Sequence, residues 1–165
     1  MSGDETAAAE ISVHLADETA TRNLGAALAA ACAPGSVVLL DGPLGAGKTT
    51  FVAGFARAIG AADAASPSFV IAHRYAGGRM PVWHLDLYRL ESEAEIDALD
   101  LEQYLPCDGV TLVEWAARAA GSQRWPSDRI QIELSFDGAG RRAVLHGAGN
   151  GAKAVRLVSE ARSLA

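Results

Sequence analysis

The sequence has few cysteines, no surplus of basic residues and no long hydrophobic run. Its two cysteines, Cys32 and Cys107, stand far apart and outside any C-x-x-C pair. The sequence therefore predicts neither a zinc site nor a disulfide framework. Acidic residues outnumber basic ones by 20 to 14, and the net charge of −6 disfavours a protein that binds nucleic acid on its own. No apolar run approaches the roughly 20 residues that span a bilayer, and residues 1–10 carry acids where a signal peptide needs cations. We therefore expect a cytoplasmic protein that does not contact membranes.

The composition is typical of one globular domain. The chain has 165 residues, half of them hydrophobic, and its 17 glycines and 6 prolines are close to average usage. Collagen-like, low-complexity and disordered classes are thereby excluded. We expect a single domain over residues 1–146, followed over 147–165 by a glycine-rich linker and a short C-terminal tail.

Hydrophobic periodicity predicts alternating strands and helices. The run from Val37 to Leu40 is continuously apolar, which is typical of a central strand buried on both faces. Glycine-containing turns at 76–79 and 137–140 predict two antiparallel hairpins. The expected strands cover residues 11–15, 37–40, 69–75, 80–87, 110–113, 130–136 and 142–146, and the expected helices cover 17–32, 49–59 and one or two short segments within 92–105.

A glycine-rich segment joins the central strand to the next helix. Residues 42–49 fit the P-loop pattern G-x-x-x-x-G-K-[ST], and both flanks fit as well. Glycines let backbone N–H groups surround phosphate oxygens, and the positive end of the helix adds to the attraction. Lys48 would bridge the β- and γ-phosphates of ATP, and Thr49 would place its hydroxyl on Mg²⁺. The expected nucleotide-binding residues here are Gly42, Leu44, Gly45, Ala46, Gly47, Lys48, Thr49 and Thr50, in an α/β fold with a P-loop NTPase-type, mostly parallel sheet, flanking helices and added antiparallel hairpins.

A P-loop enzyme also needs an acid at the end of a neighbouring strand. Asp86 and Glu114 are the candidates, and Glu114 ends the apolar strand 110–113, where an acid can orient the attacking water. Trp115 could offer an aromatic face to the adenine. Neighbouring residues of a strand point to opposite faces, so the chain must turn between Glu114 and Trp115 if both are to face one nucleotide. From spacing alone, a solvated strand end is the less favoured alternative for either acid, whereas a plain core position fits Trp115 equally well.

Several segments together resemble the bacterial TsaE (YjeE) ATPases. They stand in the order and approximate spacing of that family, and the resemblance runs from about Asp17 to His146. The H-x-D-x-Y-R-L segment and the Glu-Trp pair are far more specific than the P-loop. The segments are GPLGAGKTT (42–50), SPSF (66–69), HRY (73–75), HLDLYRL (84–90) and EW (114–115).

The resemblance implies a small ATPase that binds Mg-ATP. It implies work with TsaD and TsaB proteins in making threonylcarbamoyladenosine beside the anticodon of tRNA, and contact with tRNA only through that complex. By the same resemblance Lys48 and Thr49 bind phosphate and metal, Asp86 and Glu114 serve the metal and the water, and Trp115 contacts the base. The implied metal ligands are Thr49, Asp86 and Glu114, and the implied catalytic residues are Lys48, Asp86 and Glu114.

The sequence departs from the family pattern at two positions. Ser68 replaces a threonine but keeps a hydroxyl that could approach Mg²⁺ or the γ-phosphate, whereas Arg74 replaces an acid, so that any contact made by the acid is in doubt. We interpret His73 and His84 as structural or partner-facing, because no second metal-ligating side chain has suitable spacing. Arg89 is a candidate contact for phosphate or a partner, although a solvated arginine fits equally well.

Two other functions use the same motif. A small-molecule kinase shares the P-loop but usually carries an arginine-rich lid, and no such insertion is present. In a pure binding switch, ATP would only order residues 66–69 for a partner, with incidental hydrolysis. The sequence does not separate the switch from the ATPase.

Overall fold

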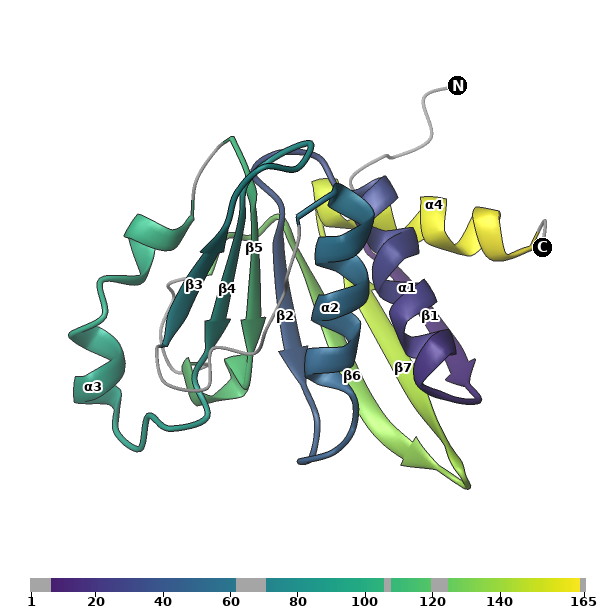
Figure 1. Cartoon of the computed structure of the whole chain (residues 1–165), viewed down its shortest axis with the longest axis horizontal. Helices are drawn as coiled ribbons and strands as arrows, with labels where there is room; N and C mark the ends of the chain where they lie inside the picture. The colour runs from purple at the N-terminus through teal and green to yellow at the C-terminus, as the bar shows by residue number, and fades with distance from the viewer. Residues whose placement is uncertain (1–6, 62–70, 106–107, 120–124, 164–165) are drawn as a thin grey trace.

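The computed structural model describes residues 7–61, 71–105, 108–119 and 125–163. They form one seven-stranded sheet of order β1-β7-β6-β2-β5-β4-β3 with flanking helices (Figure 1). The strands are β1 (Ala9–Leu15), β2 (Val37–Asp41), β3 (Ala72–Tyr75), β4 (Val82–Asp86), β5 (Val110–Glu114), β6 (Arg129–Asp137) and β7 (Gly140–Gly147). The helices are α1 (Glu18–Ala31), α2 (Lys48–Ile59), α3 (Glu93–Asp97) and α4 (Asn150–Ser163), with 3₁₀ turns η1 (Leu101–Tyr104) and η2 (Ala116–Ala119).

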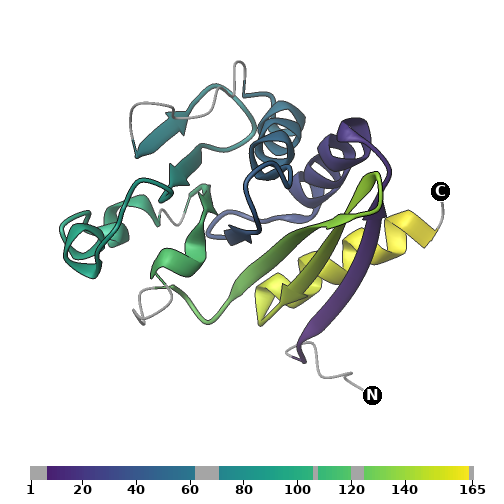
Figure 2. The ribbon, with the colours of Figure 1, turned by 90° about the horizontal axis from the view of Figure 1, so that it is seen from below.

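The middle of the sheet is parallel, and its flanks are antiparallel. Strands β6, β2, β5 and β4 run parallel, whereas β3 pairs antiparallel with β4, and β7 pairs antiparallel with both β6 and β1. The expected fold class and both predicted hairpins are therefore confirmed. The carboxyl ends of β2, β4 and β5 meet at one edge, the position where open α/β folds bind ligands. Figure 2 is a view from below, onto this edge.

Helices α1 and α2 pack side by side over one face of the sheet (Figures 1 and 2). Leu24 and Leu28 of α1 and Phe55 of α2 are completely buried, as their helical spacing predicts. The two helices approach so closely that a Cβ on Gly25 would lie 2.2 Å from a backbone oxygen of α2. This tight packing holds α2, and with it the loop that precedes α2, against the rest of the domain.

The other face of the β2–β5–β4 region carries a second, smaller hydrophobic core. Val37 and Leu39 of β2 face this core, while Val38 and Leu40 face the helices α1 and α2. Residues of α3, η1 and η2 cover this second core. The continuous apolar run of β2 is thus explained by burial on both faces, as the sequence predicts.

The C-terminal segment differs from the linker and tail that we expect over 147–165. Within the described residues it forms the 14-residue helix α4, whose Val155 and Val158 are buried in the main core. The glycines mark close packing rather than a linker, because a Cβ on Gly147 would lie 2.4 Å from the backbone oxygen of Gly151. Every helix in the described part of the chain is too short or too polar to span a membrane.

Cys32 is buried at the end of α1, and burial raises the pKa of its thiol to about 12. It is therefore an unreactive part of the core. Cys107 lies outside the described residues.

Candidate functional site

The glycine-rich loop at residues 42–47 connects β2 to α2 and needs its glycines. Gly42, Gly45 and Gly47 all have positive φ angles, of 140°, 79° and 105°. Such angles strain any residue with a Cβ, and at Gly42 a Cβ would also lie 2.2 Å from the carbonyl oxygen of Leu134. The loop is therefore a shaped backbone cradle, as the sequence pattern predicts.

Lys48, the first residue of α2, reaches back over this loop. Its ammonium donates hydrogen bonds to the carbonyl oxygens of Gly42 (2.6 Å) and Pro43 (3.0 Å), and only 5% of the residue is exposed. Burial lowers the pKa of Lys48, and the nearby carboxylates, with Glu114 first among them, oppose that shift. A desolvated cation thus lies at the loop, and its hydrogen bonds to described residues go to neutral carbonyl groups, which favours their exchange for an anionic partner.

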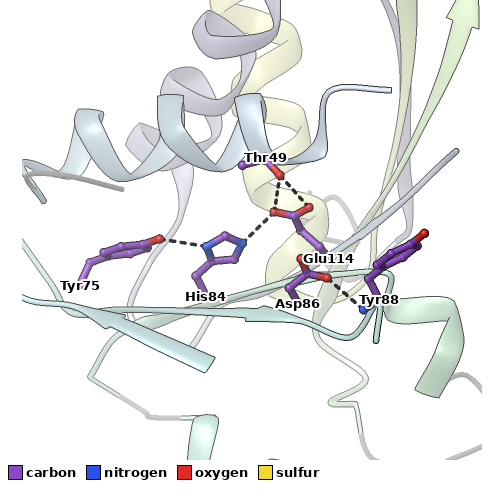
Figure 3. Close-up of polar contacts among 6 residues, drawn as sticks. All are labelled: Thr49, Tyr75, His84, Asp86, Tyr88 and Glu114. Atoms are coloured by element: carbon purple, nitrogen blue, oxygen red, sulfur yellow. Dashed lines mark hydrogen bonds and ion pairs between the residues drawn. The ribbon is translucent and has the colours of Figure 1, made fainter. Parts of the chain in front are cut away.

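Glu114 lies at the carboxyl end of β5, directly beside the start of α2. It is 2% exposed, and both of its carboxylate oxygens accept from the hydroxyl of Thr49 at 3.1 Å (Figure 3). The pairing register places Asp86 of β4 opposite Glu114. The three residues that we expect to serve the metal and water therefore meet at one edge of the sheet.

Asp86 is held in place from its own strand end. Its Oδ1 accepts a hydrogen bond from the backbone N–H of Tyr88 at 3.0 Å. Burial raises the pKa of Asp86 above its ordinary value, and the negative charge of Glu114 raises it further, against the lowering effect of the Tyr88 N–H bond. Two carboxyl groups close together in a desolvated site favour a bound cation.

The chain turns at Trp115, as we expect. This residue has a φ of 59°, rare for a residue with a side chain, and its N–H donates to the carbonyl of Leu40 at 2.9 Å. The ring centre lies 3.8 Å from the ammonium of Lys48 and 4.9 Å from the ring of Tyr88. Trp115 thus packs against Lys48, the residue that we expect to contact the β- and γ-phosphates. A contact with the base stays a prediction.

A cavity of about 280 Å³ borders the glycine-rich loop at Gly45, Ala46 and Gly47. Neither Lys48 nor Trp115 borders it, but Thr50 does, together with the start of α1 and the turn between β6 and β7. The residues that line it are Leu15, Ala16, Asp17, Glu18, Thr21, Gly45, Ala46, Gly47, Thr50, Ala139, Gly140 and Arg141. Arg141 also donates from Nε and Nη2 to the carbonyl of Gly45, which ties the hairpin to the loop.

Three residues near the site were not singled out for it from the sequence. Asp41 ends β2, and its carboxylate accepts from the N–H of Ala117 at 2.9 Å, so that it braces the turn after Trp115. His84 and Tyr75 extend the hydrogen-bonded group behind Glu114 (Figure 3). Asp41 could have been found as a third strand-end acid, but nothing in the spacing showed that His84 reaches Glu114.

Other residues that we expect to contribute to the site lie at its margin or outside the residues that the structure describes. Leu44 is 71% exposed at the tip of the loop, and Arg89 is exposed after β4. Arg74 is exposed on β3, with its guanidinium 5.9 Å from the ring of Trp83. His73 is exposed, whereas His84 is buried and therefore does not face a partner. Ser68 lies outside the described residues.

The donor set fits Mg²⁺ better than a transition metal. Hydroxyl and carboxylate oxygens of Thr49, Asp86 and Glu114 are hard ligands, and the glycine cradle leaves room for phosphate oxygens to supply others. Within the residues that the structure describes, no group of three His, Cys, Asp or Glu side chains forms a closed metal cage. Magnesium at nucleotide sites characteristically uses one or two protein carboxylates plus phosphates, so the residues present fit this ion.

Comparison with known proteins agrees with the sequence resemblance. Residues 15–144 match the family described as "Threonylcarbamoyl adenosine biosynthesis protein TsaE". The Nostoc protein named tRNA threonylcarbamoyladenosine biosynthesis protein TsaE is 39% identical over 79% of this chain and 81% of its own. The Bacillus subtilis protein of the same name is 40% identical over 75% of this chain and 77% of its own.

A solved structure shows the same fold. The crystal structure of Bacillus subtilis YdiB superposes with a TM-score of 0.75 and 30% sequence identity, over 96% of this chain and 97% of that one. The residues that match the family, 15–144, include the glycine-rich loop, the ends of β2, β4 and β5 and the β3–β4 hairpin. The chain belongs to the TsaE family.

Proposed function

We propose that this protein binds Mg-ATP at residues 42–50, hydrolyses it, and thereby supports turnover of a TsaD/TsaB complex that makes threonylcarbamoyladenosine in tRNA. The observation that carries the proposal is the meeting of Lys48, Thr49 and Glu114. They come from the loop–helix junction and from the end of β5, and they lie together beside a loop in which Gly42, Gly45 and Gly47 have positive φ angles.

The chain would bind the phosphates with its loop and its lysine. Backbone N–H groups of the loop and the N-terminus of α2 would face phosphate oxygens, because both are oriented donors near the positive end of a helix dipole. Lys48 would exchange its bonds to the neutral carbonyl groups of Gly42 and Pro43 for ion pairs with phosphate oxygens, in which both partners carry charge. Thr49, Asp86 and Glu114 would hold Mg²⁺, which neutralises charge on the β- and γ-phosphates when bound.

Glu114 would position the attacking water. Its carboxylate is buried, fixed from one side by Thr49, and located at the phosphate end of the loop. Hydrolysis of ATP has little covalent chemistry for a protein to perform, so orientation of water and stabilisation of charge provide most of the acceleration. Removal of this carboxylate should therefore affect the rate much more than nucleotide binding.

The base and sugar would occupy the 280 Å³ cavity. Thr50 and the loop border that cavity, whereas Trp115 lies against Lys48 at the phosphate end. An alternative position, with the adenine stacked on Trp115, follows from the family resemblance. The two positions of the base predict different effects of Trp115 variants on ATP binding.

The partnership rests on family membership and on charge. The relatives are named for tRNA threonylcarbamoyladenosine biosynthesis, but this chain has a net charge of −6. A protein with this charge gains little from phosphate neutralisation, so contact with tRNA would pass through the partner proteins in the cytoplasm. TsaD-like and TsaB-like proteins are the partners that we propose.

Phosphate release tests the proposal. We expect the purified chain to release phosphate from ATP in a Mg²⁺-dependent reaction that TsaD-like and TsaB-like proteins stimulate, without any added phosphate acceptor. A requirement for a small-molecule acceptor would instead show a kinase. Partner binding that depends on ATP, with no turnover in any combination, would show a binding switch.

A further inference from the structure

A row of buried hydrogen bonds runs from the edge of the sheet to the start of α2. The hydroxyl of Tyr75 lies 3.0 Å from Nδ1 of His84, and Nε2 of His84 lies 2.8 Å from Oε1 of Glu114, which also accepts from Thr49 (Figure 3). His84 is 1% exposed and Tyr75 is 3% exposed. The imidazole thus lies entirely inside the protein, between a phenol and the carboxylate of the candidate site.

The position of His84 on β4 explains why it reaches this carboxylate. Side chains two residues apart in a strand lie on the same face, so His84 and Asp86 share a face of β4. Asp86 is opposite Glu114 in the register. The H-x-D spacing therefore places one residue beside the metal position and the other against the carboxylate of the neighbouring strand.

The partners of His84 determine which nitrogen carries the proton. A carboxylate oxygen only accepts, so the 2.8 Å contact with Oε1 of Glu114 requires a proton on Nε2, and the hydroxyl of Tyr75 then donates its hydrogen bond to Nδ1. A neutral imidazole that accepts at Nδ1 carries its proton on Nε2. This tautomer donates its Nε2–H to Oε1 of the Glu114 carboxylate.

We propose that His84 is a positioning residue for ATP hydrolysis, which Tyr75 holds as the Nε2–H tautomer so that it fixes the orientation of the Glu114 carboxylate. This inference rests on the proposed function, because Glu114 is the residue through which His84 acts. One oxygen of Glu114 is bound by His84, so rotation of the carboxylate away from the loop breaks a buried hydrogen bond. Partners of this kind around catalytic or metal-bound groups typically change activity about 10–100-fold when they are removed.

Four variants separate positioning from simple core packing. His84→Leu removes the donor, and His84→Gln retains an amide N–H near the position of Nε2. Tyr75→Phe removes the hydroxyl that fixes the tautomer. His146→Gln, at an exposed position on β7, is the matched control. For each variant, circular dichroism checks the fold, calorimetry gives the affinity for Mg-ATP, and phosphate release gives kcat and KM.

We expect kcat to fall about 10–100-fold in His84→Leu, while KM and the calorimetric affinity stay within about twofold. His84→Gln should recover most of kcat, and His146→Gln should behave as the wild type. In the free wild-type protein, ¹⁵N NMR of the imidazole should show Nε2 protonated and Nδ1 unprotonated. Tyr75→Phe should shift that spectrum toward a tautomer mixture and lower kcat.

The inference is overturned if His84→Leu folds and hydrolyses ATP at the wild-type rate, or if His84→Gln is as slow as His84→Leu. An Nδ1–H tautomer in the free wild type would also overturn it. If His84→Leu does not fold, Tyr75→Phe decides, because a wild-type spectrum and rate in that variant contradict the proposal. Failure of the wild type itself to hydrolyse ATP would overturn the proposed function instead, and the NMR result would still report the hydrogen-bond arrangement.

Discussion

The ammonium nitrogen of Lys48 lies 3.8 Å from the centre of the Trp115 indole ring. A cation at this distance is attracted to the face of the ring, and here it also bonds to two loop carbonyls. Phosphate oxygens offer the lysine a negatively charged partner in place of neutral carbonyl groups. Any anion that takes Lys48 from the ring should therefore alter the surroundings of the indole.

Trp115 fluorescence should report this exchange. In a Trp83→Phe, Trp125→Phe background, we expect Mg-ATP to change the emission of Trp115 in a saturable titration. Lys48→Ala should change the emission of the free protein and abolish the response. An unchanged spectrum at nucleotide concentrations that calorimetry shows to be saturating would contradict the exchange.

Lys48→Ala should also lose most of the ATP affinity. The variant removes a charged hydrogen-bond donor to the phosphates, which is worth about 1.5–3 kcal/mol, so the Kd should rise by roughly tenfold or more. Isothermal calorimetry measures it. Lys153→Ala is the matched control, because Lys153 is exposed on α4 and away from the loop. Equal loss of affinity in both variants would point to net charge rather than to the site.

The location of the base can be tested by comparing ATP with inorganic triphosphate. If the base occupies the 280 Å³ cavity, Ala139→Trp should weaken ATP binding and leave triphosphate binding nearly unchanged, since Ala139 lines that cavity. Trp115→Ala should then affect both ligands equally. If the adenine stacks on Trp115 instead, Trp115→Ala should weaken only ATP, by about 1–3 kcal/mol.

Asp86→Asn should stabilise the free protein. Burial raises the pKa of Asp86 in the fold, so its ionisation costs stability as the pH rises from the unfolded value of 3.8 through the folded one. Near neutral pH the cost is fully present, and the asparagine avoids it while its oxygen can still accept from Tyr88. We expect a higher Tm for the variant at pH 7.

Calorimetry without nucleotide, repeated between pH 4 and pH 7, follows this difference. The advantage of Asp86→Asn should shrink as the pH falls toward 4, because the wild-type carboxyl becomes protonated in the fold. Asp108→Asn, at an exposed position, serves as the control. A lower Tm for Asp86→Asn at pH 7, or a difference that does not vary with pH, would contradict the account.

Much of the fold was predictable because local signals and burial agree. The apolar run of β2 and the helices expected over 17–32 and 49–59 all form as the sequence predicts, and the carboxylate of Asp17 caps α1 by accepting from the N–H of Ala20. The C-terminal helix was missed because its glycines resemble a linker. Only the three-dimensional packing of Gly147 against Gly151 shows that small residues were needed there.

The site was predictable in part for a similar reason. Strand-end acids follow from topology, so the approach of Glu114 to Thr49 could be expected once the strands were placed in one parallel sheet. The contact between His84 and Glu114 could not, because it depends on which strands are neighbours and on their register. A cross-strand contact of this kind leaves no periodic signal in a single sequence.

The most direct test of the account compares nucleotide binding with turnover in Glu114→Gln, with Glu160→Gln on the exposed face of α4 as control. Glutamine keeps the volume and one acceptor oxygen but loses the charge. We predict Mg-ATP affinity close to that of the wild type, and hydrolysis slower by about 10²–10⁴, the range of general-base and positioning effects. Hydrolysis at the wild-type rate, with binding intact, would contradict the central role of Glu114.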